Sequence, residues 1–310
     1  MQKAKKVGLG QNTLKSRLFY ASLVIIPTLQ FLIFWVFVNF NSILLAFKVF
    51  DKSAASMSDF NWGLGNFKHW FTSASIKGMK YNYKDVLPAL GVTMKSYVIS
   101  LGVGLPLGLF FSYYMFKKMP GSKLFRVLLF MPSILSAAPL AVIFLNMTTS
   151  FLGGPDGWFP LLDFDKNKFF SMTFFGLFIG FGTSVLMYTN KMDSIAPEII
   201  ESAHLDGANG IKEFWYIVLP QTFSIVQVFL ITGFASAFSN QGNAFILFEY
   251  SSPREITSLG FLLWNGIRDA GVSMNKMAPY AALGLIITIV VVPLTFLFRW
   301  LIEKYGWKEE

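Results

Sequence analysis

Six long apolar runs constrain this chain more than any other feature of its sequence. They cover residues 18–42, 89–116, 125–149, 169–190, 221–247 and 278–301. About 20 apolar residues in a helix cross the hydrocarbon core of a bilayer, and a helix satisfies its own backbone groups there. Hydrophobic residues make up 54% of the 310 residues and charged residues only 14%, which is far from a soluble average. The sequence therefore predicts an all-α integral membrane protein with six transmembrane helices.

The basic residues indicate on which side of the membrane the ends of the chain lie. The formal net charge of +9 would suggest nucleic acid as a partner of a soluble protein, but here many basic residues flank apolar runs, so no nucleic acid is expected. The connection between the second and third runs carries four basic residues and no acid: Lys117, Lys118, Lys123 and Arg126. Cytoplasmic loops are enriched in Lys and Arg. With six spans, both termini are then cytoplasmic: residues 1–17 form an N-terminal segment, 18–301 the transmembrane domain and 302–310 a tail.

Residues 197–220 interrupt the apolar pattern between two predicted spans. Pro197 is favoured at the first position of a helix, and Gly207 permits the left-handed turn that ends one. Asn209 is a good N-cap for a second helix. In that helix an apolar ridge recurs at three- and four-residue intervals, formed by Ile211, Phe214, Ile217 and Val218. We expect two short amphipathic helices, the second ending where Pro220 breaks it, with a ridge that needs a groove.

The spacing within this stretch resembles a family motif. It reads Glu201, Ser202, Ala203, three residues, Gly207, nine residues, Ile217, one residue, Leu219 and Pro220. It resembles the EAA loop, E-A-A-x3-G-x9-I-x-L-P, of ABC importer permease subunits of the carbohydrate family, which is maltose-type and binding-protein-dependent. Ser202 stands where the motif has Ala, which replaces one small residue by another.

The resemblance implies how the chain is driven. The loop, residues 193–220, would lie in the cytoplasm as coupling helices that dock into a cleft on a separate ATPase subunit. The coupling residues expected from the motif are Glu201, Ser202, Ala203, Asp206, Gly207, Phe214, Ile217, Leu219 and Pro220. The fold class is then a six-helix permease with a cytoplasmic EAA coupling-helix loop, in the inner or plasma membrane of a bacterial cell.

Further partners follow from the same resemblance. They are a second homologous permease subunit, two cytoplasmic ABC ATPase subunits, an extracytoplasmic solute-binding protein, membrane lipid, and a sugar or oligosaccharide. ATP binds to the ATPase subunits, so we expect no cofactor and no metal on this chain, and the permease catalyses no reaction. The plainer alternative is an amphipathic connector between two membrane helices, with Pro197 and Gly207 as ordinary helix punctuation.

A shorter element favours sugars as the solute. Gly63, Leu64, Asn66 and Phe67 resemble the G-L-x-N-[FY] signature that precedes the second helix in carbohydrate-family permeases. The alternative is an aromatic belt at the membrane interface, formed by Trp62, Phe67, Trp70 and Phe71.

Ionisable groups are nearly absent from the predicted spans. Apart from Lys95, Arg126 and Arg299 near their ends, the six runs contain no Asp, Glu, Lys, Arg or His, although ion-coupled carriers usually need such groups inside the membrane. No Gly is followed by Lys, so the sequence has no P-loop, and it has no cysteine. An external motor is therefore favoured over a channel or an ion-coupled carrier, which stay open as alternatives.

Uncharged polar residues are the candidates for contact with the solute. Asn146 lies in the third run, and Asn240, Gln241 and Asn243 lie toward the outer part of the fifth. Neutral hydrogen-bonding groups suit a neutral polyhydroxylated solute. Each amide could instead hydrogen-bond across a helix pair, and a permease for another small polar solute, such as a peptide, amino acid or phosphate, stays open.

Overall fold

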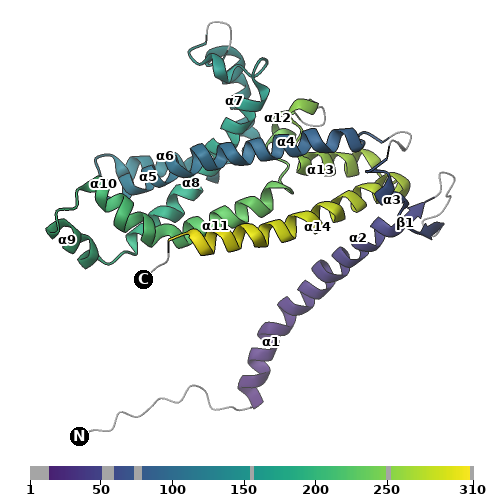
Figure 1. Ribbon diagram of the computed structural model, residues 1–310, viewed down its shortest axis with the longest axis horizontal. Helices are drawn as coiled ribbons and strands as arrows, with labels where there is room; N and C mark the ends of the chain where they lie inside the picture. The colour runs from purple at the N-terminus through teal and green to yellow at the C-terminus, as the bar shows by residue number, and fades with distance from the viewer. Residues whose placement is uncertain (1–13, 51–58, 73–78, 154–156, 249–252, 308–310) are drawn as a thin grey trace.

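The computed structural model describes residues 14–50, 59–72, 79–153, 157–248 and 253–307 (Figure 1). Long helices lying side by side form the body of the molecule. Their bounds are α4 Tyr83–Ile99, α5 Leu105–Phe116, α6 Ser122–Ile134, α8 Lys168–Asp193, α11 Leu219–Ala237 and α14 Met274–Tyr305. One π-helical turn, η2 (Ser100–Gly104), joins α4 to α5 so that the two form one span.

Five helices in the described part of the chain are long and apolar enough to cross a membrane, and a bent helix pair supplies a sixth crossing if it counts as one. The five are Phe19–Phe47, Tyr83–Phe116, Lys168–Asp193, Gly210–Ala237 and Met274–Tyr305. Each overlaps one of the predicted apolar runs. The prediction of an all-α membrane protein is therefore confirmed.

The first helix leaves the bundle. α1 (Leu14–Gln30), the π-helical η1 (Phe31–Phe37) and α2 (Val38–Phe47) are continuous and run past the predicted end at residue 42. α2 packs against α14, whereas α1 points away from the other helices (Figure 1). Large apolar side chains along α1 and η1 are exposed, which suits a helix surrounded by lipid. Residues 1–13 of the predicted N-terminal segment and 308–310 of the predicted tail lie outside the described residues.

The third predicted span is a bent helix pair rather than one straight helix. α6 ends at Ile134, and α7 (Ala137–Asn146), continued by the π-helical η3 (Met147–Phe151), leaves it at an angle of 105° (Figure 1). Pro132 has no N–H to donate within α6, and Leu135 and Ser136 are extended. Pro139 falls in the first turn of α7, where its missing N–H costs no helical hydrogen bond. Pro132 therefore lies near the end of α6 and Pro139 near the beginning of α7.

The fifth predicted span is wrong at its C-terminal end, because α11 stops at Ala237. Asn240 ends the apolar run: its Oδ1 accepts a hydrogen bond from the backbone N–H of Gly242 at 2.8 Å, and Gly242 has a φ of +62°. A short helix, α12 (Ala244–Phe248), follows. After the 3₁₀ turn η6 (Arg254–Ile256), the predicted outer loop contains a further amphipathic helix, α13 (Leu259–Ala270).

The Gly63 to Phe67 element lies beside a small hairpin at one end of the bundle. β1 (Lys48–Phe50) pairs antiparallel with β2 (Phe60–Trp62), and α3 (Gly65–Lys68) follows. Asn66 is buried, and its Nδ2 donates to the carbonyl oxygens of Ala46 at 3.0 Å and Lys48 at 2.8 Å. The amide thus ties α3 to the end of α2, which is a structural reason for this residue.

The aromatic residues of the predicted interface belt divide into two groups. Trp62 and Phe71 are exposed, as a belt requires. Trp70 is instead buried, and its Nε1–H donates to the carbonyl oxygen of Pro279 on α14 at 2.7 Å. This bond joins the segment that follows the first span to the last span.

Glycine allows α6 and α8 to approach until their backbones touch. A Cβ added at Gly182 would lie only 1.9 Å from the carbonyl oxygen of Leu129 on α6. About one turn further along α8, the Oγ–H of Ser112 on α5 donates to the carbonyl oxygen of Val185 at 2.9 Å, as is common where helices pack in membranes. A small residue at Gly182 is therefore a packing requirement.

We expect Gly182→Ala to lower the free energy of unfolding of the purified protein by about 1–3 kcal/mol, because the backbone of α6 or α8 must move to admit the methyl group. The measurement is the midpoint of thermal unfolding in detergent. Gly180→Ala is the matched control, because a Cβ there meets nothing within 4 Å. Equal midpoints for the two variants would contradict the close contact.

Candidate functional site

Residues 197–220 form a short helix, a turn and the start of a second helix, and the sequence predicts the short helix, the turn and both helix starts. α9 (Pro197–Leu205) begins at Pro197, and α10 (Gly210–Glu213) follows with Asn209 as its N-cap, whose Oδ1 accepts from the N–H of Lys212 at 3.0 Å. Gly207 has a φ of +78°, a left-handed conformation that favours glycine. Both helices lie at the end of the bundle opposite β1 and α3 (Figure 1).

An exposed apolar surface surrounds this turn. Its members, which we call the end patch, are Leu205, Ile211, Trp215 and Tyr216. Leu205 on α9 is 89% exposed. Clustered apolar exposure beside polar residues is typical of a surface that binds another protein. Glu201, Ser202, Asp206 and Gly207 are exposed in the same region.

The predicted apolar ridge mostly faces inward rather than toward a partner. Phe214 and Val218 are buried, with Leu219, in a cluster that includes Leu109, Tyr188 and Met192 of the long helices. Ala203 is buried as well, and Ile217 is half-buried. The groove that the ridge fills therefore belongs to the chain itself, except at Ile211, which is exposed.

Pro220 does not break the second helix, so that prediction is wrong. The helix is continuous from α10 through the π-helical η5 (Phe214–Val218) into α11. In η5 the N–H of Leu219 donates to the carbonyl oxygen of Phe214, one residue beyond the usual acceptor. Proline has no N–H, and its ring would clash with the carbonyl group one turn earlier in a regular α-helix. The widened turn just before Pro220 accommodates the ring, so the helix continues through it.

A buried carboxylate ties this segment to the rest of the bundle. Glu213 is 0% exposed. Its oxygens lie 3.0 Å from Nζ of Lys117, 2.6 Å from Nε2 of His204 and 3.2 Å from the hydroxyl of Tyr113. Sequence reasoning missed Glu213. The available signal was one acid within the apolar ridge, on the same predicted side as the basic turn at Lys117.

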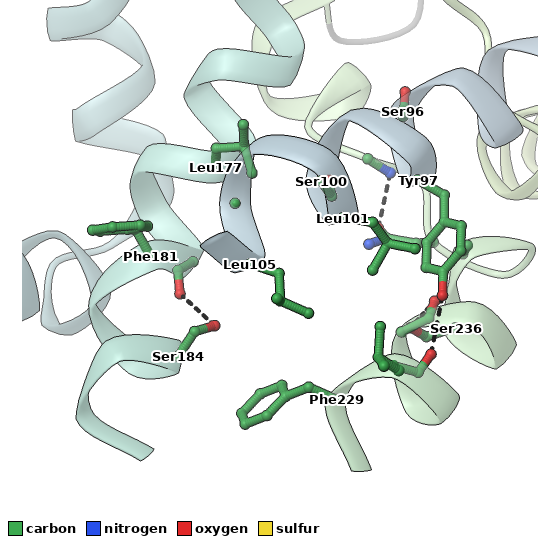
Figure 2. Close-up of a pocket in the computed structure, with 18 of the residues that line it drawn as sticks. Ser96, Tyr97, Ser100, Leu101, Leu105, Leu177, Phe181, Ser184, Phe229 and Ser236 are labelled. Atoms are coloured by element: carbon green, nitrogen blue, oxygen red, sulfur yellow. Dashed lines mark hydrogen bonds between the residues drawn. The ribbon is translucent and has the colours of Figure 1, made fainter. Parts of the chain in front are cut away.

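A cavity of about 330 Å³ opens among α4, α5, α8 and α11 (Figure 2). Figure 2 shows side chains from these helices around it, with Ser184 and Phe181 facing Tyr97 and Ser236 across the space. The hydroxyl residues of its wall are Thr93, Ser96, Tyr97, Ser100, Ser184, Tyr188, Ser236 and Ser258. Phe181, Phe229 and several Leu residues provide the apolar part. Among the described residues that line it, none is charged.

Of the four amides predicted to contact solute, the structure places only Asn240 in the cavity wall. Asn146 is exposed on α7, with its Nδ2 donating to the carbonyl oxygen of Val142 at 3.0 Å. Gln241 and Asn243 are half-buried and lie outside the wall. Asn243 packs at Gly176 of α8, where a Cβ would lie 2.7 Å from its Nδ2.

Comparison with known proteins places this geometry among transport proteins. The chain is 25% identical over 277 residues to the multiple sugar-binding transport system permease protein MsmF of Streptococcus mutans, covering 86% of this chain and 89% of that protein. It is 24% identical to the arabinooligosaccharides transport system permease protein AraP of Bacillus subtilis, covering 67% of this chain and 68% of that protein.

A solved structure shares the fold. It is a chain of a bacterial alginate ABC transporter in complex with an alginate pentasaccharide-bound periplasmic protein, similar with a TM-score of 0.68 at 18% identity over 92% of this chain and 93% of that chain. Residues 104–306, which include the cavity-lining helices α8 and α11 and the whole turn with its end patch, match a family model. The chain therefore belongs to the family of binding-protein-dependent transport system inner membrane components.

Proposed function

We propose that this chain is a permease subunit of an ATP-driven ABC importer for a sugar or oligosaccharide. It pairs with a second homologous permease, two cytoplasmic ATPase subunits and an extracytoplasmic solute-binding protein. ATP is bound by the ATPase subunits, and this chain needs no cofactor. The family, the permease relatives MsmF and AraP, and the alginate importer fold support this assignment.

The end patch supports the coupling role of α9 and α10. Leu205 and Ile211 project from two short helices whose inner residues are anchored in the bundle, so the helices can enter a groove on a partner without losing their own packing. Glu201, which matches the motif, and Asp206, at an unspecified position within it, are exposed beside the patch. The ATPase subunits are the partners from which such helices receive force.

The uncharged cavity is the observation that carries the solute class. Hydroxyl, amide and aromatic groups line it, and these suit the hydroxyls and apolar faces of a neutral sugar. A charged solute would leave water for a space that offers no opposite charge among the described lining residues, which is costly. We therefore favour a neutral sugar or oligosaccharide over a phosphate or an amino acid.

The charge at the two ends supports a cytoplasmic location for α9, α10 and both termini. The connection between α5 and α6 lies at the same end of the bundle as α9 and α10 (Figure 1). It carries Lys117 and Lys118, and the start of α6 adds Lys123 and Arg126. In the proposed cycle, closure of the ATPase pair moves these helices. The long helices then rock, and the cavity changes the side to which it opens.

Purification of the tagged chain from its native membrane tests the function. We expect an ATPase subunit and a second permease to co-purify and the eluate to hydrolyse ATP. Leu205→Glu should lower the amount of ATPase retained, because it puts a charge into the apolar patch. Val272→Glu is the matched control: Val272 is 88% exposed, close to the 89% of Leu205, but lies beyond α13. Elution of the wild-type chain alone and without ATPase activity would favour a channel or ion-coupled carrier instead.

We expect Gly207→Val to abolish coupled uptake while the chain still inserts into the membrane. A Cβ at Gly207 meets nothing within 4 Å, so the cost comes only from its left-handed φ, about 1–2 kcal/mol for an ordinary residue. Gly207→Asn is the control, because Asn tolerates this conformation. Uptake at the wild-type rate by Gly207→Val would show that coupled uptake does not require this left-handed turn.

The cavity is tested by filling it. Gly180 lines it and has open space at its Cβ position, so Gly180→Leu should reduce the transport of whichever sugar stimulates ATP hydrolysis by about tenfold or more, without loss of the ATPase subunits. Gly91→Leu is matched, because Gly91 is also open at Cβ but lies outside the cavity wall. Equal transport by both variants would place the solute path elsewhere.

A further inference from the structure

We propose that Glu213 is a positioning residue for transport: its buried carboxylate fastens the two short helices α9 and α10 to α5, so that their movement reaches the cavity. The inference rests on the proposed function, in which α9 and α10 receive the force. It assigns a role to a residue at a position that the motif leaves unspecified.

Glu213 connects three parts of the chain through one carboxylate. Oε1 accepts from Lys117, which directly follows α5, at 3.0 Å and lies 3.2 Å from the hydroxyl of Tyr113 on α5. Oε2 lies 3.0 Å from the same Lys117 Nζ and 2.6 Å from Nε2 of His204 on α9. The hydroxyl of Tyr113 also lies 2.9 Å from the carbonyl oxygen of Gly210, the first residue of α10. α9, α10 and α5 are thus joined at a single point.

Burial makes this junction stiff. The carboxylate is fully removed from solvent, so moving it away from its donors would leave a buried charge without compensation. An exposed ion pair, by contrast, exchanges its partner for water at little cost. The pair between Arg126 of α6 and Asp193 of α8 is of the second kind, with 3.9 Å between its atoms and both side chains about half exposed.

The junction also has a direct route to the cavity. The first residue of α5, Leu105, lines the cavity, and Tyr113 and Lys117 follow on the same rigid helix and its cap. Beside Glu213, the ring of Phe214 packs on Tyr113 with 5.0 Å between centroids. Phe214 belongs to the same buried cluster as Tyr188, whose side chain lies in the cavity wall. A displacement of α9 and α10 therefore has both a polar and an apolar path to the wall.

The test uses the assembled transporter and a cysteine in the cavity wall. The chain has no cysteine, so Ser236→Cys, in the wall on α11, gives it a single reactive thiol. The rate at which a fluorescent maleimide labels this thiol is compared without nucleotide and after trapping with ATP and vanadate. ATP hydrolysis by the same preparation is measured in parallel. In the wild-type background the labelling rate should differ between the two states.

The decisive variant combines Lys117→Met with Glu213→Gln, which removes both charges together and leaves no unpaired buried ion. We expect it to retain the ATPase subunits and ATP hydrolysis but to lose the nucleotide-dependent change in labelling. Arg126→Met with Asp193→Asn, the exposed pair at the same end of the bundle, should keep the change. Lys117→Arg, which preserves a cationic donor, should keep it too.

His204→Ala provides a second test that does not depend on recovery of the double variant, because His204 is 48% exposed and its removal cuts only the α9 arm. Loss of the labelling change in His204→Ala supports the inference. A wild-type change in this variant or in the double variant overturns it while the proposed function stands. Absence of ATPase subunits, or of any change, in the wild-type background would count against the proposed function itself.

Discussion

The structure depends on one constraint: inside a bilayer every backbone N–H and C=O needs a partner from the protein itself. Proline removes a donor, and at two of its prolines the chain has a π-helical turn just before the ring. η2 ends two residues before Pro106, and η5 ends two residues before Pro220. In both, the N–H of the residue just before the proline reaches back five positions, from Leu105 to Ser100 and from Leu219 to Phe214. Two long spans thereby stay continuous through a residue that usually ends a helix.

Hydroxyl groups meet the same constraint from the side chains. Thr93, Ser112, Thr189 and Thr222 each donate to the carbonyl oxygen four residues earlier in their own helix. Thr93 and Ser112 also make bonds to other elements: Thr93 Oγ1 accepts from the N–H of Leu259 at 2.9 Å, and Ser112 donates to Val185. A polar side chain in these spans is thus first a partner for backbone, and only those at the cavity wall remain available to a solute.

Sequence reasoning succeeded where the signal was local. Apolar runs located the spans, and Pro197, Gly207 and Asn209 located the two short helices, because caps and left-handed turns depend on neighbouring residues alone. It failed where the outcome depended on distant parts of the chain. Two of the three partners of Glu213, Tyr113 and Lys117, lie about 100 residues earlier, on α5 and at its end. The cavity wall depends on how each helix is rotated about its axis. The angle between α6 and α7 was not predicted either, since a composition that favours membrane insertion does not show in which direction a helix continues.

The contact between the first and last helices has a consequence for how the chain is assembled. α2 packs against α14, and the bond from Trp70 to Pro279 spans 209 residues. A ribosome releases the N-terminal helix into the membrane long before its main partner exists. Contacts so far apart in sequence slow folding, because a large loop must close before they form. Because α1 has a long apolar surface, lipid stabilises this helix as an independent segment until α14 has been synthesised and completes the bundle.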